Sequence, residues 1–387
     1  MLTRPGRMVV NGTFSRRRVS WTRNAMVLGV SCGRGHFNVH VGPGKRRAMA
    51  GRVLVTGANG FLANHLVRDL LAEGYTVIGT VRDLSDPVRT EHLRDHAEAL
   101  GCPERLELAE ADVLDADPWE GLLQGCDGLF HTATVFSLTA DADVVLNTAN
   151  LGTEHLLHAA AAARVPRIVY TSSTAAVGSG PRGRAKDEND WQSGSSMPYT
   201  AAKTQSERRA WRIAEEHDLD LRVINPTAIL GGGFSRPPPS VDWMPDLLSG
   251  AWPIVPAIPM AFVHVEDVAH AHRMAFERDE AEGRFVIAPH SGLTMIDVAR
   301  TARRLRPQAK APKRGLPRRL LPLAVFFDWL KGRKTGERRL TRAVVRGYMR
   351  GDARYSSAKA ERVLGMTWRS LDACVEDTIR AFEERAA

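Results

Sequence analysis

Short apolar runs alternate with helical periods from Arg52 onward. Six runs have the length and the β-branched content of buried strands: Val53–Val55, Thr76–Thr80, Leu106–Leu108, Gly128–His131, Arg167–Thr171 and Leu221–Ile224. Apolar residues recur at helical spacing in the stretches between them, namely Asn64–Glu73, Asn150–Arg164 and Tyr199–His217. This alternation predicts an α/β fold, a doubly wound parallel sheet that helices cover on both faces.

The pattern changes after Gly231. Residues 231–262 contain seven of the 21 prolines, which favours an irregular loop. A strand-like run at 261–265, another at Arg284–Ala288 and a terminal helix at Leu371–Glu384 follow. We therefore expect one domain over residues 49–230 and a smaller, mainly substrate-binding part over 231–387. The strand near 261–265 is expected to return to the main sheet.

The net charge of +9 is unevenly distributed. Residues 1–48 carry ten Lys/Arg and no Asp or Glu, and residues 301–350 carry sixteen Lys/Arg against Asp328 and Glu337, which leaves −15 for the rest of the chain. An acidic body argues against nucleic acid as a partner. Contact of residues 301–350 with an anionic membrane surface, with Leu320–Leu330 as the apolar face, is the less favoured alternative to a solvated basic patch.

The first 48 residues show no sustained apolar period, and we expect a basic N-terminal extension that is disordered or a mis-assigned start. Three interpretations compete: a mis-assigned start, because Met49 opens directly on a strand; a targeting segment, because Arg is abundant and acids are absent; and a basic arm. The first is favoured. The chain has four cysteines, Cys32, Cys102, Cys126 and Cys374. Because their spacing is not that of metal ligands and they are too few for a disulfide framework, we expect no metal site and a cytoplasmic protein. Because Pro322 and Asp328 interrupt Leu320–Leu330, this run predicts a buried or interfacial helix and no membrane span.

A glycine turn joins the first of these strands to an amphipathic helix. Gly57 and Gly60 would let the backbone approach a pyrophosphate, which would rest against amides over Gly57–Leu62, including those of Asn59, Phe61 and Leu62. Ala63 replaces a third glycine and is small enough for close packing. The turn predicts a dinucleotide site within residues 49–230.

The end of the second strand indicates which dinucleotide binds. Arg82 lies 25 residues after Gly57, where an acidic residue would accept the ribose 2′-hydroxyl of NAD. A guanidinium suits the 2′-phosphate of NADP instead. A surface arginine paired with Asp83 is the alternative. We expect NADP, with NAD as the less favoured cofactor.

Two further strand ends fit the same ligand. Asp112, which precedes Val113, could accept a hydrogen bond from the adenine amino group. Alternatively, Asp112 could cap a helix. The run from His131 through Thr132 and Ala133 to Thr134 places small residues where the backbone must pass close to the ribose and nicotinamide. Their order along the chain supports the dinucleotide site.

Tyr199 and Lys203 lie four residues apart, on one face of a predicted helix. A neighbouring cation stabilises phenolate, so Tyr199 could act as a general acid near neutral pH. Ser173 follows the fifth strand and could donate a hydrogen bond to the same carbonyl oxygen. Strand-end capping is the alternative role of this serine, and Ser172 and Thr174 are close substitutes for it.

From Gly51 to Ala387 the chain resembles an extended short-chain dehydrogenase/reductase. The matching motifs are Thr56–Ala63 (TGANGFLA), Asp112-Val113, Asn150–Thr153 (NLGT), Ser172-Ser173, Tyr199-x-x-x-Lys203, Asn225-Pro226 and Phe262–Asp267 (FVHVED). The resemblance implies a Rossmann fold and an NAD(P)-dependent oxidoreductase. It also implies that Ser173, Tyr199 and Lys203 are the catalytic triad, and that Pro226 lies beside the nicotinamide.

Within this family the run Val81-Arg82-Asp83 and the His131–Thr134 motif resemble the dihydroflavonol reductase, cinnamoyl-CoA reductase and aldehyde reductase branch. The resemblance implies reduction of an aldehyde or ketone carbonyl, with a monomer or homodimer. A nucleotide-sugar epimerase or dehydratase and a 3-beta-hydroxysteroid-type dehydrogenase are the alternatives. The proline-rich segment contains Trp243, Met244, Trp252 and Ile254. If these side chains line the pocket, we expect an apolar or aromatic substrate, but they could equally pack the segment against the core. His264 is expected to be a satisfied core histidine.

Overall fold

The computed structural model describes residues 18–22, 25–31, 36–40, 51–133, 142–179, 183–194, 197–335 and 352–386. The chain divides into two compact units, residues 1–49 and residues 50–387. In the first unit, three strands form an antiparallel sheet: β1 (Arg18–Thr22), β2 (Ala25–Ser31) and β3 (His36–His40). These strands differ from the disorder expected for the segment, because alternate residues of the runs can pair as neighbouring strands. The interpretation of the segment as a mis-assigned start stays a prediction.

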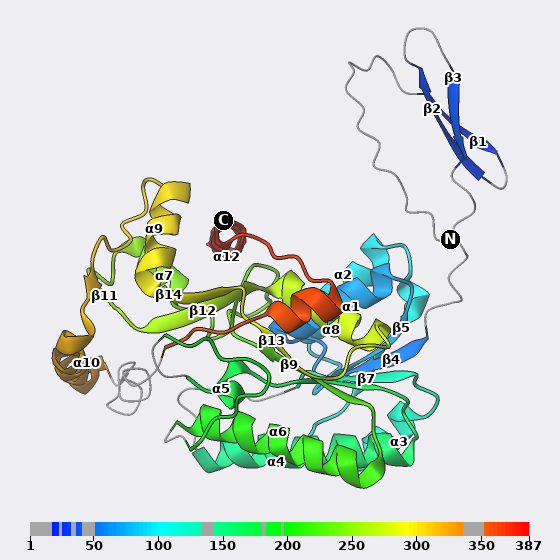
Figure 1. The fold of residues 1–387 in the computed structure, drawn as a ribbon, viewed down its shortest axis with the longest axis horizontal. Helices are drawn as coiled ribbons and strands as arrows, with labels where there is room; N and C mark the ends of the chain where they lie inside the picture. The colour runs from blue at the N-terminus through cyan, green and yellow to red at the C-terminus, as the bar shows by residue number, and fades with distance from the viewer. Residues whose placement is uncertain are drawn as a thin grey trace, which may run out of the picture. The chain divides into compact units, whose positions relative to one another are not determined.

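A parallel sheet of seven strands lies at the centre of the second unit, in the order β13-β9-β8-β7-β4-β5-β6 (Figure 1). Its strands are β4 (Arg52–Val55), β5 (Thr76–Val81), β6 (Leu106–Glu110), β7 (Gly128–His131), β8 (Ile168–Thr171), β9 (Leu221–Pro226) and β13 (Gly283–Ile287). The central strands are buried almost throughout, because helices cover both faces. The expected doubly wound α/β fold is confirmed.

Two helical layers enclose this sheet. On one face, α1 (Phe61–Ala72) packs against α8 (Val265–Glu277), with α2 (Pro87–Ala99) beside α1. The other face carries α3 (Pro118–Leu123), α4 (Ala142–Ala162) and α6 (Pro198–His217), and Figure 1 shows α4 and α6 running together below the sheet. Each layer has its own apolar core, represented by Leu66 on the first face and Trp119 on the second.

The strand order reverses beside β4. From β4 the chain moves outward through β5 and β6, and then crosses to β7, β8 and β9 on the other side. In open α/β sheets ligands bind at the carboxyl ends of the strands around such a switch point. The predicted cofactor and catalytic residues follow the carboxyl ends of strands in this sheet or lie on the helices that come after them.

A smaller mixed sheet lies in the C-terminal part. Strand β12 (Pro259–His264) is parallel to β10 (Ala228–Leu230) and antiparallel to β14 (His290–Thr294). Its core is shared with α7 (Met244–Ser249), α9 (Met295–Leu305) and α12 (Leu371–Ala386). The remaining elements are η1 (Pro103–Arg105), α5 (Thr174–Val177), β11 (Val255–Pro256), β15 (Gly315–Leu316), η2 (Arg318–Leu320), α10 (Leu321–Thr335) and the short π-helix η3 (Ala360–Leu364).

The strand expected near 261–265 exists as β12, but it joins the small sheet and does not return to the main one. The main sheet is extended instead by β13, which pairs with β9. Residues Arg284–Ile287 of β13 are buried without interruption, as a strand covered on both faces requires. Strand β12 pairs with β10, which begins only two residues after the end of β9 and leads the chain away from the main sheet.

The apolar run Leu320–Leu330 is helical, as expected: Leu320 ends η2, and the other residues form the first two thirds of α10. Leu321 and Val325 are buried, whereas Leu323 and Phe326 are about half exposed. No helix in the described part of the chain is long and apolar enough to cross a membrane. Thr134 and residues 336–350 of the basic stretch lie outside the described residues.

Candidate active site

The glycine turn joins β4 to α1 at the switch point. Gly57 has φ = +62°, and a Cβ atom there would lie 3.2 Å from Ala133 Cβ. Gly60 precedes α1, which has no side-chain cap, so the first amide N–H groups of the helix can serve another acceptor. Ala63 is buried in this packing. A turn without room for a side chain at Gly57, beside uncapped amides, fits a pyrophosphate group. The turn and the first residues of α1 include the other expected contacts: Asn59, Phe61 and Leu62.

Thr56 connects this turn to the end of β7. Its Oγ1 atom accepts hydrogen bonds from the backbone N–H groups of Thr132 and Ala133, both at 3.0 Å, and lies 2.9 Å from Nδ1 of His131. Burial, together with the charge of Lys203, lowers the pKa of His131 to about 3, so the imidazole is neutral and Nδ1 can accept the hydroxyl proton. Thr132 and Ala133 are thereby held beside the glycine turn.

Arg82 follows the carboxyl end of β5 and is exposed. Its neighbour Asp83 accepts hydrogen bonds from Ser85, from Oγ at 2.7 Å and from the backbone N–H at 2.9 Å, which lower the pKa of the Asp83 carboxyl. Within the described ranges, Arg82 makes no ion pair with Asp83 or with any other carboxylate. Its guanidinium is thus uncompensated at the edge of the sheet where a ligand would bind.

Asp112 and Val113 lie in the loop after β6. Asp112 Oδ1 accepts a hydrogen bond from the Leu114 N–H at 2.9 Å, which fixes the loop in an Asx turn. Gly152 of α4 approaches this loop closely, because a Cβ there would lie 3.0 Å from Val113 Cβ. Nearby, Asn150 has a buried Oδ1 atom with no hydrogen-bond partner in the described structure. The Asn150–Thr153 motif therefore packs α4 against the predicted adenine side of the site.

Ser173 directly follows β8, at the same edge of the sheet. Its Oγ atom accepts a hydrogen bond from the Ala175 N–H at 3.1 Å and caps α5. The hydroxyl lies 3.5 Å from the carbonyl oxygen of Pro226, the last residue of β9, which is the outer limit of a hydrogen bond. The capping role is therefore observed, and the hydroxyl proton remains weakly held. A capping oxygen can still donate that proton to a ligand.

Helix α6 carries both Tyr199 and Lys203. Lys203 is 4% exposed, and its Nζ donates to the carbonyl oxygen of Thr171, the last residue of β8, at 3.0 Å. Burial lowers the pKa of Lys203 to about 8, against the opposing effect of the Glu207 carboxylate. Tyr199 lies half-buried one turn earlier. The hydrogen bond from Lys203 to Thr171 holds this face of α6 against the end of β8, two residues before Ser173. The predicted catalytic residues therefore share one edge of the sheet.

One turn after Lys203, a completely buried carboxylate lies beneath the site. Glu207 has no exposed surface and forms an ion pair with Arg284 of β13, with 2.6 Å between Oε1 and Nε. The Arg284 guanidinium also stacks on the Trp191 ring, 3.9 Å from its centroid. An additional hydrogen bond reaches Glu207 Oε1 from Trp211 Nε1, at 3.4 Å. The charge of Arg284 is thus neutralised inside the fold.

The same carboxylate connects the two strand ends of the site. Ser172 Oγ donates to Glu207 Oε2, and Asn225 Nδ2 donates to the same oxygen at 2.8 Å. These donors directly precede Ser173 and Pro226 in the sequence. Glu207 therefore holds the ends of β8 and β9 at a fixed distance from α6.

Sequence reasoning missed this pair, although a signal was present. Glu207 repeats the four-residue spacing of Tyr199 and Lys203 along one helix face. Arg284 begins an otherwise apolar run that ends at Ala288. A charge inside a strand that is buried on both faces requires a buried partner of opposite charge.

The proline-rich segment packs partly into the C-terminal core. Trp243 and Met244 are buried there, which supports the packing interpretation for these two side chains, whereas Trp252 is half-buried and Ile254 is half exposed. His264 is a satisfied core histidine, as expected. Its Nε2 lies 3.0 Å from Asp377 Oδ2, and its Nδ1 accepts a hydrogen bond from the backbone at the start of α8.

The sequence is similar to known proteins. The profile of the NAD dependent epimerase/dehydratase family matches residues 53–288, which include the glycine turn, Ser173, Tyr199 and Lys203. The chain is 39% identical over 252 residues to cinnamoyl-CoA reductase 1 of Petunia hybrida, covering 62% of this chain and 74% of that protein. It is 33% identical over 278 residues to dihydroflavonol 4-reductase of Zea mays, covering 68% and 77%.

Solved structures agree with the sequence relatives. The crystal structure of gox2253 matches with a TM-score of 0.73 and 29% identity over 86% of this chain and 98% of that chain. The yeast methylglyoxal/isovaleraldehyde reductase Gre2, complexed with NADPH, matches with a TM-score of 0.67 and 26% identity over 86% and 99%. The chain therefore belongs to the NAD dependent epimerase/dehydratase family, as an NAD(P)-dependent oxidoreductase of the branch that includes dihydroflavonol and cinnamoyl-CoA reductases.

Proposed function

We propose that the protein uses NADPH to reduce an aldehyde or ketone carbonyl to an alcohol. The position of Lys203 is the observation that supports this function best. Its ammonium is buried, binds the carbonyl of Thr171 just before Ser173, and shares a helix with Tyr199. A buried cation near a phenol favours the phenolate form, which makes Tyr199 a stronger acid near neutral pH.

In this mechanism Tyr199 and Ser173 bind the carbonyl oxygen of the substrate. Tyr199 donates a proton to that oxygen, and the hydrogen bond from Ser173 strengthens as negative charge develops there. Lys203 stabilises the phenolate that remains, and Lys203 and Pro226 would hold the nicotinamide side of the cofactor. Bound NADPH supplies the hydride. Glu207 supports these residues from below through its contacts with both strand ends.

The residues of the glycine turn fit the pyrophosphate of NADP, and Arg82 fits its 2′-phosphate. Replacing Arg82 with Gln should raise the KM for NADPH about tenfold or more and leave the KM for NADH unchanged, because one charge-assisted hydrogen bond to the 2′-phosphate is lost. Arg94→Gln removes an exposed arginine from the neighbouring α2 and is the matched control. Equal KM values for NADPH in the two variants would contradict the assignment of Arg82.

The substrate is proposed to be an apolar or aromatic carbonyl compound. The similar proteins bear the names of reductases for cinnamoyl-CoA, dihydroflavonol and methylglyoxal or isovaleraldehyde. The test is NADPH consumption by the full chain with aromatic aldehydes, flavanonols, ketosteroids and sugar nucleotides. Oxidation of NADPH with an aldehyde or flavanonol is expected. Conversion of a sugar nucleotide without net NADPH consumption would instead establish an epimerase or dehydratase.

A further inference from the structure

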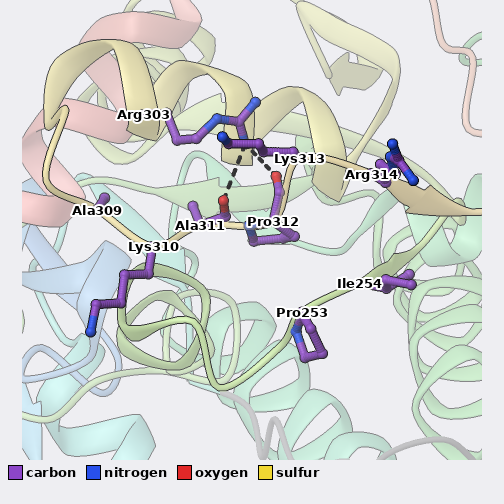
Figure 2. A pocket seen from close by; sticks show the side chains of 9 residues that line it. All are labelled: Pro253, Ile254, Arg303, Ala309, Lys310, Ala311, Pro312, Lys313 and Arg314. Carbon is purple, nitrogen blue, oxygen red and sulfur yellow. Dashed lines mark hydrogen bonds between the residues drawn. The ribbon is translucent and has the colours of Figure 1, made fainter.

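A pocket of about 450 Å³ lies in the C-terminal part, and none of the predicted catalytic or cofactor-binding residues lines it. Its walls come from the loop before β11 and from the segment that runs from α9 to β15. Strands β11 and β15 join these two segments, with Val255 paired to Gly315. Figure 2 shows the lining residues: Pro253, Ile254, Arg303, Ala309, Lys310, Ala311, Pro312, Lys313 and Arg314.

The pocket gathers four cations and no acid. Among the described residues, none of these four side chains forms an ion pair with a carboxylate: Arg303, Lys310, Lys313 and Arg314. Like charges held within one pocket repel one another, and the repulsion is strongest at low salt.

Other arginines of the same segment are neutralised by nearby acids. Arg300 pairs with Asp297 at 2.9 Å, and Arg306 pairs with Glu376 at 2.9 Å. Arg304 also has a carboxylate partner, on α12. Among the described residues of this segment, the cations without a carboxylate partner are therefore the ones that line the pocket. The lining thus differs from the rest of the segment in having no acid to compensate its charge.

The pocket wall is held in place by backbone contacts. Nη1 of Arg303 donates to the carbonyl oxygens of Ala311, at 3.3 Å, and Pro312, which leaves Nε and Nη2 free of partners in the described structure (Figure 2). Gly250 has φ = +82°, and a Cβ there would lie 2.9 Å from Lys310 Cβ, so the absence of a side chain lets the two segments pack closely. One cation of the pocket is thus pre-oriented for a ligand.

We propose that this pocket binds a small organic diphosphate. Two adjacent phosphate groups would neutralise several of the unpaired cations at once, and Arg303 presents its remaining N–H groups in a fixed position. The volume lies within the usual range of about 300–1,000 Å³ for ligand pockets. Ile254, which is half exposed, and Pro253 offer apolar contacts to the organic part. A concave site suits a small molecule better than a flat membrane surface. This binding does not depend on the proposed reductase activity.

Calorimetric titration of the full chain with ADP tests this site. The protein is first saturated with NADP⁺, so that the glycine turn is filled and does not compete for the diphosphate. ADP binding that weakens as salt rises is expected, together with weaker binding of inorganic pyrophosphate, which lacks the organic part. Absence of ADP binding to the NADP⁺-saturated protein would overturn the proposal, and equal affinity for pyrophosphate would overturn the role of the apolar wall.

Two variants assign binding to the pocket. Lys313→Gln/Arg314→Gln, and the same variant with Arg303→Gln added, should weaken ADP binding about tenfold or more because charge-assisted hydrogen bonds are lost. The control Arg212→Gln/Arg300→Gln/Arg380→Gln removes three exposed arginines, each paired with an acid within one helical turn. It should bind ADP within twofold of the parent chain. Equal weakening in the control would contradict the pocket.

A membrane surface is the competing ligand for these cations. Vesicles of phosphatidylcholine with about one quarter phosphatidylserine provide that comparison at physiological salt. Co-sedimentation of the parent chain with these vesicles, lost in the Lys313→Gln/Arg314→Gln variant, together with no ADP binding, would replace the diphosphate with an anionic membrane. ADP binding without co-sedimentation is the result that supports the pocket.

Discussion

Two charged regions of this molecule differ in how their charge is compensated. Beneath the candidate active site, Glu207 and Arg284 are buried and form an ion pair with each other. In the C-terminal pocket, Lys313 and Arg314 are exposed and have no carboxylate partner among the described residues. Water can solvate the second group but not the first, so only the buried charges require partners within the fold.

This difference separates structural charge from charge that is free for a ligand. The buried pair connects β13 with α6 and, through Ser172 and Asn225, with the ends of β8 and β9. The pocket cations connect few parts of the chain. Changes to the first region should therefore act on stability and catalysis, whereas changes to the second should act mainly on binding.

Glu207→Ala should have the largest effect on stability. It leaves the Arg284 guanidinium buried without its counter-charge, which should reduce the free energy of unfolding by about 3–5 kcal/mol. Urea denaturation followed by circular dichroism measures this loss. Glu216→Ala, which removes an exposed acid of the same helix, is the control and should cost less than about 1 kcal/mol. A loss for Glu207→Ala no greater than that of the control would mean that the pair is not a structural connection.

The pH dependence of turnover reports how Glu207 acts on Lys203. Turnover should fall as pH rises through about 8, because Lys203 then loses the proton whose charge stabilises phenolate. In Glu207→Gln the attraction that raises the pKa of Lys203 is removed, so the alkaline fall should move to lower pH. The shift should appear in kcat at saturating NADPH. An unchanged alkaline limb in a folded Glu207→Gln protein would show that Glu207 has only a structural role.

Removing pocket cations should have the smallest effect on the fold. Lys313→Gln/Arg314→Gln should change the free energy of unfolding by less than about 0.5 kcal/mol, and at low salt it should slightly stabilise the protein because repulsion is relieved. Thermal unfolding at two salt concentrations measures the sign. A large destabilisation that salt does not alter would show that these side chains support the fold and would remove the contrast between the two regions.

The sequence predicted the main sheet well, because strands that are buried on both faces read as short apolar runs between helical periods. It placed β12 in the wrong sheet, since pairing partners depend on where β10 leads the chain after β9. The predicted site residues lie at one edge of the sheet, as the order of strand ends implied. The Glu207–Arg284 pair was missed because the two residues are 77 positions apart and only the fold brings them together.

Tyr199→Phe provides the most direct test of carbonyl reduction at this site. The variant keeps the ring and removes only the proposed proton donor, while the glycine turn and Arg82 are untouched. NADPH binding should stay within about twofold of the parent chain, and turnover of an accepted aldehyde should fall about 100-fold or more. Turnover close to that of the parent chain, with NADPH still bound, would contradict the assignment of Tyr199 as the acid.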